Sequence, residues 1–321
     1  MEKEKGEEDG SPCLWMLPEA CLDEILALTR PRDVCRLSLV SPSLRSAANS
    51  DSVWAKFLPS DYRTIIAGSP TPIPYFRSLR DLYVYLSHHP LLIDEGRKSF
   101  SLEKTSGKKC YFLGARDLNI AWADTPGYWE WTSLPESRFT IFQWRRYPFL
   151  EIYIVTQLKF VWWLQIWGTI RTGLLSPLTF YRAYFVYKFK DGYGFDYRPS
   201  EVSVRISGAE SKKRFAFLHP DGEQEDWTLP SDAEYEGPGG TPPLIQGTRD
   251  PRNSTGILAS IMQDDKQLPK LRDDGWFELE LGEFFTENED DCIEMKMQEP
   301  QRGFPKRGLI VEGIEIRPIV Y

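Results

Sequence analysis

The spacing of apolar residues changes once along this chain of 321 residues, and that change limits the possible folds more than any other feature. In the first sixty residues, apolar side chains recur three or four positions apart, as at Leu22, Ile25 and Leu26, which predicts amphipathic helices. From Cys110 onward, apolar and polar residues alternate, as in residues 201–206, which predicts strands with one buried face. We therefore expect an α+β multidomain chain, in which a small all-α domain precedes an all-β sandwich.

Local start signals place several short helices in the first sixty residues. Pro18 and Pro31 each precede an apolar helical pattern, and proline at a first helical position costs no hydrogen bond. Ser41 and Asp51 are positioned to cap free backbone amides of two further helices. Three or four short helices in about 45 residues cannot bury all of their apolar faces internally, so this unit is expected to bind a partner surface.

Changes in composition divide the chain into four parts. Residues 1–11 are acidic and polar and are expected to be a disordered tail. Residues 12–60 form the helical unit, and residues 61–106 are interpreted as a linker that carries one helix near residues 76–86. Residues 107–321 form the expected sandwich.

Charge and cysteine content argue against several classes of function. Asp and Glu number 47 against 39 Lys and Arg, a net charge of −8, so binding to nucleic acid through its phosphates is not expected. The five Cys form no CxxC pair, which argues against a disulfide framework or a structural zinc site and favours a reducing compartment. No metal or other cofactor is expected.

One apolar stretch, residues 147–170, raises the question of membrane insertion. It contains Glu151, Gln157, Lys159 and Gln165 and lacks the roughly 18 uninterrupted apolar residues of a membrane-spanning helix. Its β-branched and aromatic residues suit two consecutive strands, so no membrane partner is expected.

Side chains that support catalysis elsewhere occur here without a matching arrangement. The pairs Asp264-Asp265, Asp273-Asp274 and Asp290-Asp291 lie beside turn residues, where Asp accepts local backbone hydrogen bonds. The 3 His have no matched Ser or Cys nucleophile near them. We assign no catalytic residue, and a glycoside-processing enzyme is the least favoured class.

The helical unit carries a motif with several members in order. They are Leu17, Pro18, Leu22, Ile25, Leu26, Asp33, Arg36, Leu37, Val40, Arg45 and Trp54. This pattern resembles the F-box, although a generic helical cap on the sandwich would show part of it. The resemblance implies docking onto the Skp-type adaptor subunit of a cullin-type (SCF) ubiquitin ligase. The contacts it implies are Leu17, Pro18, Leu22, Ile25 and Leu26.

The second half resembles another family. The matching positions are residues 114–118, Trp122, residues 128–131, Tyr184, residues 275–276, residues 281–285 and residues 313–318. They resemble the plant phloem protein two-like lectins, which include the jasmonate-induced lectin of tobacco. The resemblance implies a jelly-roll-like lectin sandwich whose ligands are N-acetylglucosamine oligomers or glycoproteins.

The same resemblance places carbohydrate-binding residues at Trp122, Trp129 and Glu299. An indole face can stack on the C–H face of a sugar, but without the resemblance core packing is equally well supported for both tryptophans. Alternation puts Trp122 on the same strand face as Ile120, so we expect it to be partly buried. Trp129 follows the turn at residues 126–127 and is expected to be the exposed platform.

Two positions depart from the lectin pattern. Cys292 stands where relatives have a second sugar-binding glutamate. Residues 140–157 interrupt a passage that is short in relatives, and this segment is either a genuine extra strand or a sequence artefact such as translated non-coding sequence.

The two resemblances together predict a non-enzymatic adaptor that selects glycoproteins for ubiquitylation in the nucleus and cytoplasm. The alternative is a carbohydrate-binding stress lectin with a vestigial F-box and no role in ubiquitin transfer.

Overall fold

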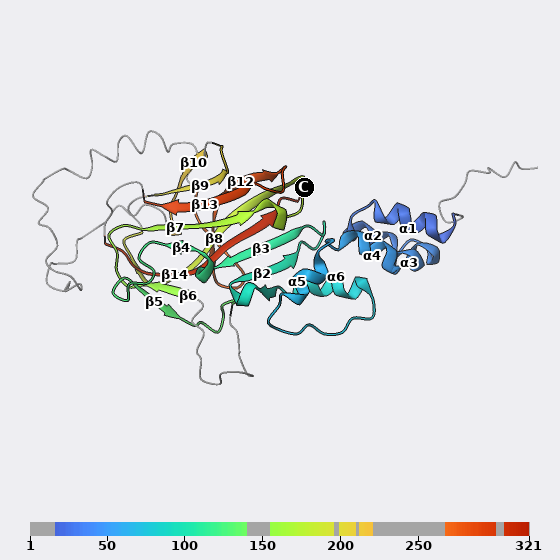
Figure 1. Cartoon of the computed structure of the whole chain (residues 1–321), viewed down its shortest axis with the longest axis horizontal. Helices are drawn as coiled ribbons and strands as arrows, with labels where there is room; N and C mark the ends of the chain where they lie inside the picture. Colours follow the sequence, from blue (N-terminus) through green and yellow to red (C-terminus); the bar gives the residue numbers. More distant parts are fainter. Residues whose placement is uncertain are drawn as a thin grey trace, which may run out of the picture.

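The computed structural model describes residues 17–139, 155–195, 199–209, 212–220, 267–299 and 305–320. Within these ranges a group of helices is followed by two antiparallel sheets (Figure 1). The expected α+β order, a small all-α domain followed by a β-sandwich, is confirmed.

The helices begin close to the signals in the sequence. Their bounds are α1 (Glu19–Ala27), α2 (Pro31–Leu37), α3 (Pro42–Ala48), α4 (Asp51–Phe57), α5 (Tyr62–Ala67) and α6 (Leu79–His88), with 3-10 turns η2 (Asp94–Gly96), η3 (Ala115–Asp117) and η4 (Thr172–Leu174). Ser41 caps α3 as expected, because its hydroxyl accepts a hydrogen bond from the Leu44 amide at 3.2 Å. Trp54 of α4 is buried in the bundle, and its Nε1 donates to the Ala48 carbonyl at 2.7 Å.

Two sheets form the sandwich. The strands are β1 (Leu91–Ile93), β2 (Lys98–Leu102), β3 (Lys109–Gly114), β4 (Asn119–Ile120), β5 (Trp129–Thr132), β6 (Val155–Leu158), β7 (Gln165–Arg171), β8 (Thr179–Tyr193), β9 (Ser200–Ile206), β10 (Lys212–Ala216), β11 (Lys270–Leu271), β12 (Phe277–Thr286), β13 (Cys292–Gln298) and β14 (Arg307–Pro318). Sheet A has the order β1-β2-β3-β14-β8-β12-β11, with β6 beside β14 and β5 beside β6. Sheet B has the order β10-β9-β13-β7-β4.

The aromatic strand β8 lies near the centre of sheet A, between β14 and β12. Tyr181, Ala183, Phe185 and Tyr187 alternate along it and are all fully buried. Because alternate residues of a strand point to one face, these four side chains fill the space between the sheets. Their hydrophobic cluster continues without a break to Leu26 of the helical domain.

The segment expected to be a linker contributes to the sandwich. Residues 61–106 contain the expected helix as α6, and they also contain β1 and β2. Strand β1 pairs with β2, and β2 pairs with β3. Sheet A therefore begins before residue 107, where the composition of the sequence placed the boundary. Short strands such as β1 give too brief an alternation to be recognised in the sequence.

The apolar stretch at residues 147–170 forms strands where the structure describes it. Val155–Leu158 is β6 and the following strand, β7, begins at Gln165. Of the segment 140–157, the last three residues belong to β6, while residues 140–154 lie outside the described residues. Among the described residues, no helix is both long and apolar enough to span a bilayer.

Candidate functional sites

Helix α1 divides the residues assigned to adaptor contact into two groups. Leu17, Pro18 and Ile25 lie at the surface, whereas Leu22 and Leu26 are buried. The two leucines belong to the hydrophobic cluster that α1 shares with α3 and α4. The three surface residues can therefore contact a partner directly, whereas the two buried leucines hold α1 against the rest of the bundle.

Three apolar residues of the helical domain are more exposed than the leucines and the isoleucine assigned to adaptor contact. Leu28 is 87% exposed after α1, and Leu39 and Val40 are 78% and 66% exposed after α2. Large apolar groups left in water commonly mark an interface. Leu28 and Leu39 lie beyond the ends of their helices, where the apolar periodicity that identified the other residues no longer applies.

Trp122 projects from a turn whose backbone is held from both sides. The φ angle of Trp122 is 59°, in the left-handed region that bulky residues rarely adopt. The Nε1 of Trp129 donates to the Ala121 carbonyl at 3.0 Å, and the Nε1 of Trp131 donates to the Ala123 carbonyl at 3.1 Å. These two hydrogen bonds fix the turn and keep Trp122 in its unusual conformation.

The order of exposure of Trp122 and Trp129 is the reverse of the expectation, and the expectation that Trp129 is the exposed platform was wrong. Trp122 is 49% exposed, whereas Trp129 is 2% exposed. Strand β4 ends at Ile120, so the alternation that suggested burial does not reach Trp122. Trp129 begins β5 and pairs with Leu158 of β6, which places its ring in the core.

Further aromatic rings surround Trp122. The ring of Tyr128 lies 5.9 Å from it and that of Trp163 lies 5.5 Å from it, measured between centroids. Trp162, the neighbour of Trp163, is 45% exposed. Trp122 is therefore a supported aromatic surface, since its ring has one tilted contact with Tyr128 and one edge contact with Trp163 while part of it faces solvent.

A groove of about 340 Å³ lies beside this turn. Its lining residues are Arg116, Ala123, Asp124, Pro126, Trp129, Glu130, Trp131 and Lys159. Two cations and two carboxylates line it together with two indoles, so the groove offers both donors and acceptors around apolar surface.

Arg116 covers one wall of the groove. Its guanidinium lies 3.7 Å from the centre of the Trp131 ring, in a cation–π stack. Burial lowers the pKa of Arg116, and the nearby Asp124 carboxylate opposes that shift. On the same side, the Lys159 ammonium is 3.3 Å from the Glu130 carboxylate.

Glu299 does not face this surface. Its side chain is 6% exposed, and its Oε1 lies 2.5 Å from the Nζ of Lys306, which is itself buried. Its backbone amide donates to the Leu164 carbonyl at 3.0 Å. The sequence could not reveal this ion pair, because its two residues come from opposite sides of residues 300–304. Cys292, the other departure, begins β13 and pairs with Arg171.

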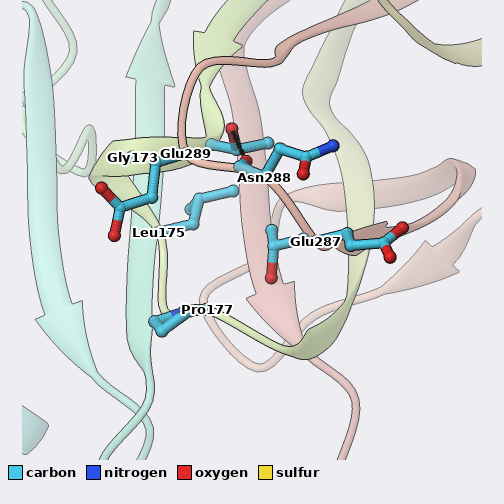
Figure 2. Close-up of a pocket in the computed structure, with 8 residues that line it drawn as sticks. Gly173, Leu175, Pro177, Glu287, Asn288 and Glu289 are labelled. Atoms are coloured by element: carbon cyan, nitrogen blue, oxygen red, sulfur yellow. Dashed lines mark hydrogen bonds between the residues drawn. The ribbon is translucent and has the colours of Figure 1, made fainter.

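A second cavity is smaller and structural. It holds about 20 Å³, room for about one water molecule. Figure 2 shows Glu287, Asn288 and Glu289 around it, with Pro177 below. The Asn288 carbonyl accepts from the Thr172 hydroxyl at 2.5 Å, so this loop is fastened to η4.

Metal-binding groups of three or more His, Cys, Asp or Glu do not occur among the residues that the structure describes. The sites therefore consist of an apolar helical surface and an aromatic turn with a mixed-charge groove.

Comparison with known proteins gives two family matches. The model described as phloem protein 2 matches residues 108–318, and the model described as F-box domain matches residues 14–56. Together they cover the helices α1 to α3, most of α4, and the sandwich from β3 onward.

Curated relatives from Arabidopsis thaliana match along nearly the whole chain. The F-box protein PP2-B15 is 37% identical over 309 residues, which is 94% of this chain and 96% of the relative. The F-box protein PP2-B13 is 37% identical over 308 residues, 95% of this chain and 99% of the relative. The F-box protein VBF is 37% identical over 307 residues, with the same coverage of 95% and 99%.

Proposed function

Because the chain belongs to the phloem protein 2 family and carries an F-box domain, we propose that it is the substrate-recognition subunit of a cullin-type (SCF) ubiquitin ligase. Its sandwich binds glycans or glycoproteins that contain N-acetylglucosamine. The observation that carries the proposal is the presence of two separate recognition surfaces on one chain. The helices α1 to α4 lie at one end of the molecule, and β4 and β5, which flank Trp122, lie toward the other (Figure 1).

The F-box domain implies binding to a Skp1-type adaptor, and the exposed residues of α1 support that role. Leu17, Ile25 and Leu28 remain partly or largely in solvent although the rest of the bundle is well packed. An apolar surface on so small a bundle is stabilised by a partner that covers it. Ubiquitin transfer itself would be carried out by the partner subunits.

Capture of a Skp1-type adaptor tests this half of the proposal. The double variant Leu17→Ala with Pro18→Ala and the single variant Leu28→Asp should each lose capture. The matched control is Leu178→Asp, which changes a leucine of the sandwich that is 73% exposed and should leave capture unchanged. Undiminished capture by both helical variants would contradict the adaptor role.

The glycan-binding half rests on the turn and the groove. A sugar presents an apolar C–H face and a ring of hydroxyls, so it needs an aromatic plane with donors and acceptors beside it. Trp122 supplies the plane, while Arg116 and Lys159 can donate and Asp124 and Glu130 can accept. The balanced charge of the groove favours a neutral sugar over a phosphate or a sulfate.

In this arrangement Trp122 contacts the ligand, and the buried Trp129 supports the turn through its hydrogen bond to the Ala121 carbonyl. Glu299 is not assigned a contact, because its carboxylate faces Lys306.

Titration of the whole chain with N-acetylglucosamine oligomers of increasing length tests the glycan-binding half. We expect saturable binding followed by tryptophan fluorescence, with intact oligomers recovered afterwards. Shortened oligomers would instead favour a glycoside-processing enzyme. Absence of binding to any oligomer or N-glycan would contradict the glycan half.

The second candidate, a stress lectin with a vestigial F-box, differs in one observable. Such a protein would bind glycans and fail to capture the adaptor even before substitution. The exposed Leu28, Leu39 and Val40 favour the adaptor, because an interface without a partner would not be expected to keep large apolar groups in water. An adaptor of this kind would act in the nucleus and cytoplasm.

A further inference from the structure

The segment between the two family matches is folded and touches both domains. Neither match includes residues 57–107, yet this segment contains α5, α6, β1 and β2. Helix α6 packs on α4 of the helical domain and on β2 of the sandwich. In Figure 1, α5 and α6 lie between the helices α1 to α4 and the strands β2 and β3.

Tyr83 of α6 links the two domains through one side chain. Its ring centroid lies 5.1 Å from that of Trp54 and 6.5 Å from that of Phe57, both in α4. Its hydroxyl donates to the Glu103 carbonyl at 3.1 Å, in the turn between β2 and β3. Tyr83 is 3% exposed, so both contacts are sheltered from water.

The turn between β2 and β3 abuts the helical domain directly. The Glu103 carboxylate accepts hydrogen bonds from the backbone amides and the hydroxyls of Thr105 and Ser106, which fixes the turn. Gly107 has a φ of +71°, and a Cβ there would lie 3.1 Å from the Phe57 carbonyl and 3.3 Å from a ring carbon of Tyr83. The two domains are thus in contact at a position where even a methyl group is crowded.

An ion pair between Lys109 and Asp61 adds a second contact at the junction. Lys109, the first residue of β3, places its Nζ 2.8 Å from the Asp61 carboxylate just before α5. The Lys109 side chain is 9% exposed. Its backbone is anchored in the sandwich, since its amide donates to the Ser176 hydroxyl and its carbonyl accepts from the Tyr181 hydroxyl, each at 3.0 Å.

We propose that residues 57–107 form a rigid joint, which holds the ligand-binding turn of the sandwich at a fixed position relative to the adaptor-binding helices. Domains joined by a flexible linker move independently, and a large apolar interface between them removes that freedom. Here the hydrophobic cluster runs from Leu26 through Tyr83 to Ile316. Tyr83 and Lys109 are positioning residues, which act by orienting the two recognition surfaces.

A distance measurement in the free chain tests the joint without reference to any ligand. Spin labels are placed on the exposed Cys35 of α2 and on Thr169→Cys of β7, with Cys13, Cys21 and Cys292 replaced by Ser. We expect a single narrow distribution of label distances. A broad or multiple distribution in this otherwise unaltered chain would overturn the proposal.

Substitutions at two residues of the junction, Gly107 and Tyr83, test whether its contacts hold the two domains in place. Gly107→Leu should shift or broaden the distribution, because its side chain would meet Phe57 and Tyr83. Gly208→Leu is the matched control, since Gly208 has a similar φ of +80° with nothing within 4 Å of a Cβ. Tyr83→Ala should broaden the distribution, and Tyr83→Phe, which keeps the ring, should restore most of the narrow component. An unchanged distribution in both Gly107→Leu and Tyr83→Ala, with thermal melts showing folded chains, would overturn the proposal.

A rigid joint would also restrict which lysines of a bound glycoprotein receive ubiquitin. This consequence rests on the proposed function and is measured separately, by identifying the modified lysines. With a bound glycoprotein, the parent chain should direct ubiquitin to a small fixed set of lysines. Gly107→Leu should spread modification over additional lysines while capture of adaptor and glycan is retained. Failure of the parent chain to bind glycan would count against the proposed function and leave the distance result intact. An unchanged set of lysines in a variant with a broadened distribution would refute the role of the joint in lysine selection.

Discussion

At the scale of single residues, Trp122 and Trp129 separate ligand binding from stability. Trp122 is 49% exposed on a turn fixed by two indole N–H groups. We predict that Trp122→Ala weakens binding of N-acetylglucosamine oligomers about tenfold, since one stacked aromatic contact contributes about 0.5–1.5 kcal/mol and about 1.4 kcal/mol is one decade of affinity. Calorimetric titration measures the loss, with Tyr75→Ala, at 92% exposure, as an aromatic control outside the sandwich.

Trp129→Ala should behave in the opposite way. Trp129 is 2% exposed, so its removal leaves a cavity and is predicted to cost about 3–5 kcal/mol of unfolding free energy. Denaturant melts of the two variants decide between the roles. A melt of Trp129→Ala that matches the parent chain, or a Trp122→Ala chain that fails to fold, would show that the assignments are reversed.

Glu315 gives the molecule a pH dependence of known sign. Burial opposes its charged form, but Arg138, Arg272 and Arg317 outweigh burial and lower the pKa of Glu315 to about 2 from an ordinary value of 4.5. A carboxylate with a depressed pKa contributes stability above its unfolded pKa, and this contribution is lost as pH falls toward the folded pKa. We therefore expect the free energy of unfolding to fall between about pH 4.5 and pH 2.

The substitution Glu315→Gln checks the source of that dependence. It leaves three guanidiniums around a neutral group, of which Arg272 and Arg317 keep Glu278 as a partner, so the cost is at most about the 3–5 kcal/mol of a fully broken buried pair. The variant should be destabilised at pH 7 and should lose part of the slope below pH 4.5. A slope equal to that of the parent chain would assign the acid sensitivity to other carboxylates.

At the scale of secondary-structure elements, the sequence predicted those helices and strands that are stabilised by interactions between neighbouring residues. The helices that begin at Pro31 and Pro42 and the alternating strand β9 depend on neighbouring residues, and the sequence predicted them. The turn that carries Trp122 is held by two indoles that lie seven and nine residues further along the chain, so alternation misplaced Trp122. Likewise the lectin resemblance implied that Glu299 binds the ligand. Its ion pair with Lys306 is a tertiary contact, which the spacing of residues in the sequence cannot predict.

The groove between η3 and β5 provides a prediction at this scale. Arg116 of η3 stacks on Trp131 of β5, so it presents guanidinium N–H groups to a ligand in the groove. We predict that Arg116→Ala weakens binding of longer oligomers about tenfold, because a charged hydrogen bond contributes about 1.5–3 kcal/mol. Binding of the single sugar should change less. Titration against oligomers of one to four sugars measures this difference, and an equal loss at every length would show that the groove does not extend the site.

At the scale of the whole molecule, the sandwich depends on strands that precede the phloem protein 2 match. That match begins at residue 108, whereas β1 and β2 lie before it; β2 pairs with β3, and β1 pairs with β2. A fragment of residues 108–321 would lose the buried Leu91, Phe100 and Leu102 and would leave β3 as an open edge. Unpaired edges invite intermolecular pairing.

We therefore predict that the fragment 108–321 aggregates or melts at a lower temperature than the fragment 70–321, which keeps α6, β1 and β2. Light scattering and thermal melts, with the full chain as reference, measure the difference. Loss of β1 and β2 removes four buried apolar side chains, those of Leu91, Leu92, Phe100 and Leu102. Each contributes about 1.5–3 kcal/mol on burial, which together is a large part of the stability of an ordinary domain. Because Tyr83 and Leu86 of α6 would be uncovered in 70–321, that fragment should still melt below the full chain. Equal melting temperatures for the two fragments would mean that β3 needs no neighbour on that side and that the sandwich begins at residue 108 after all.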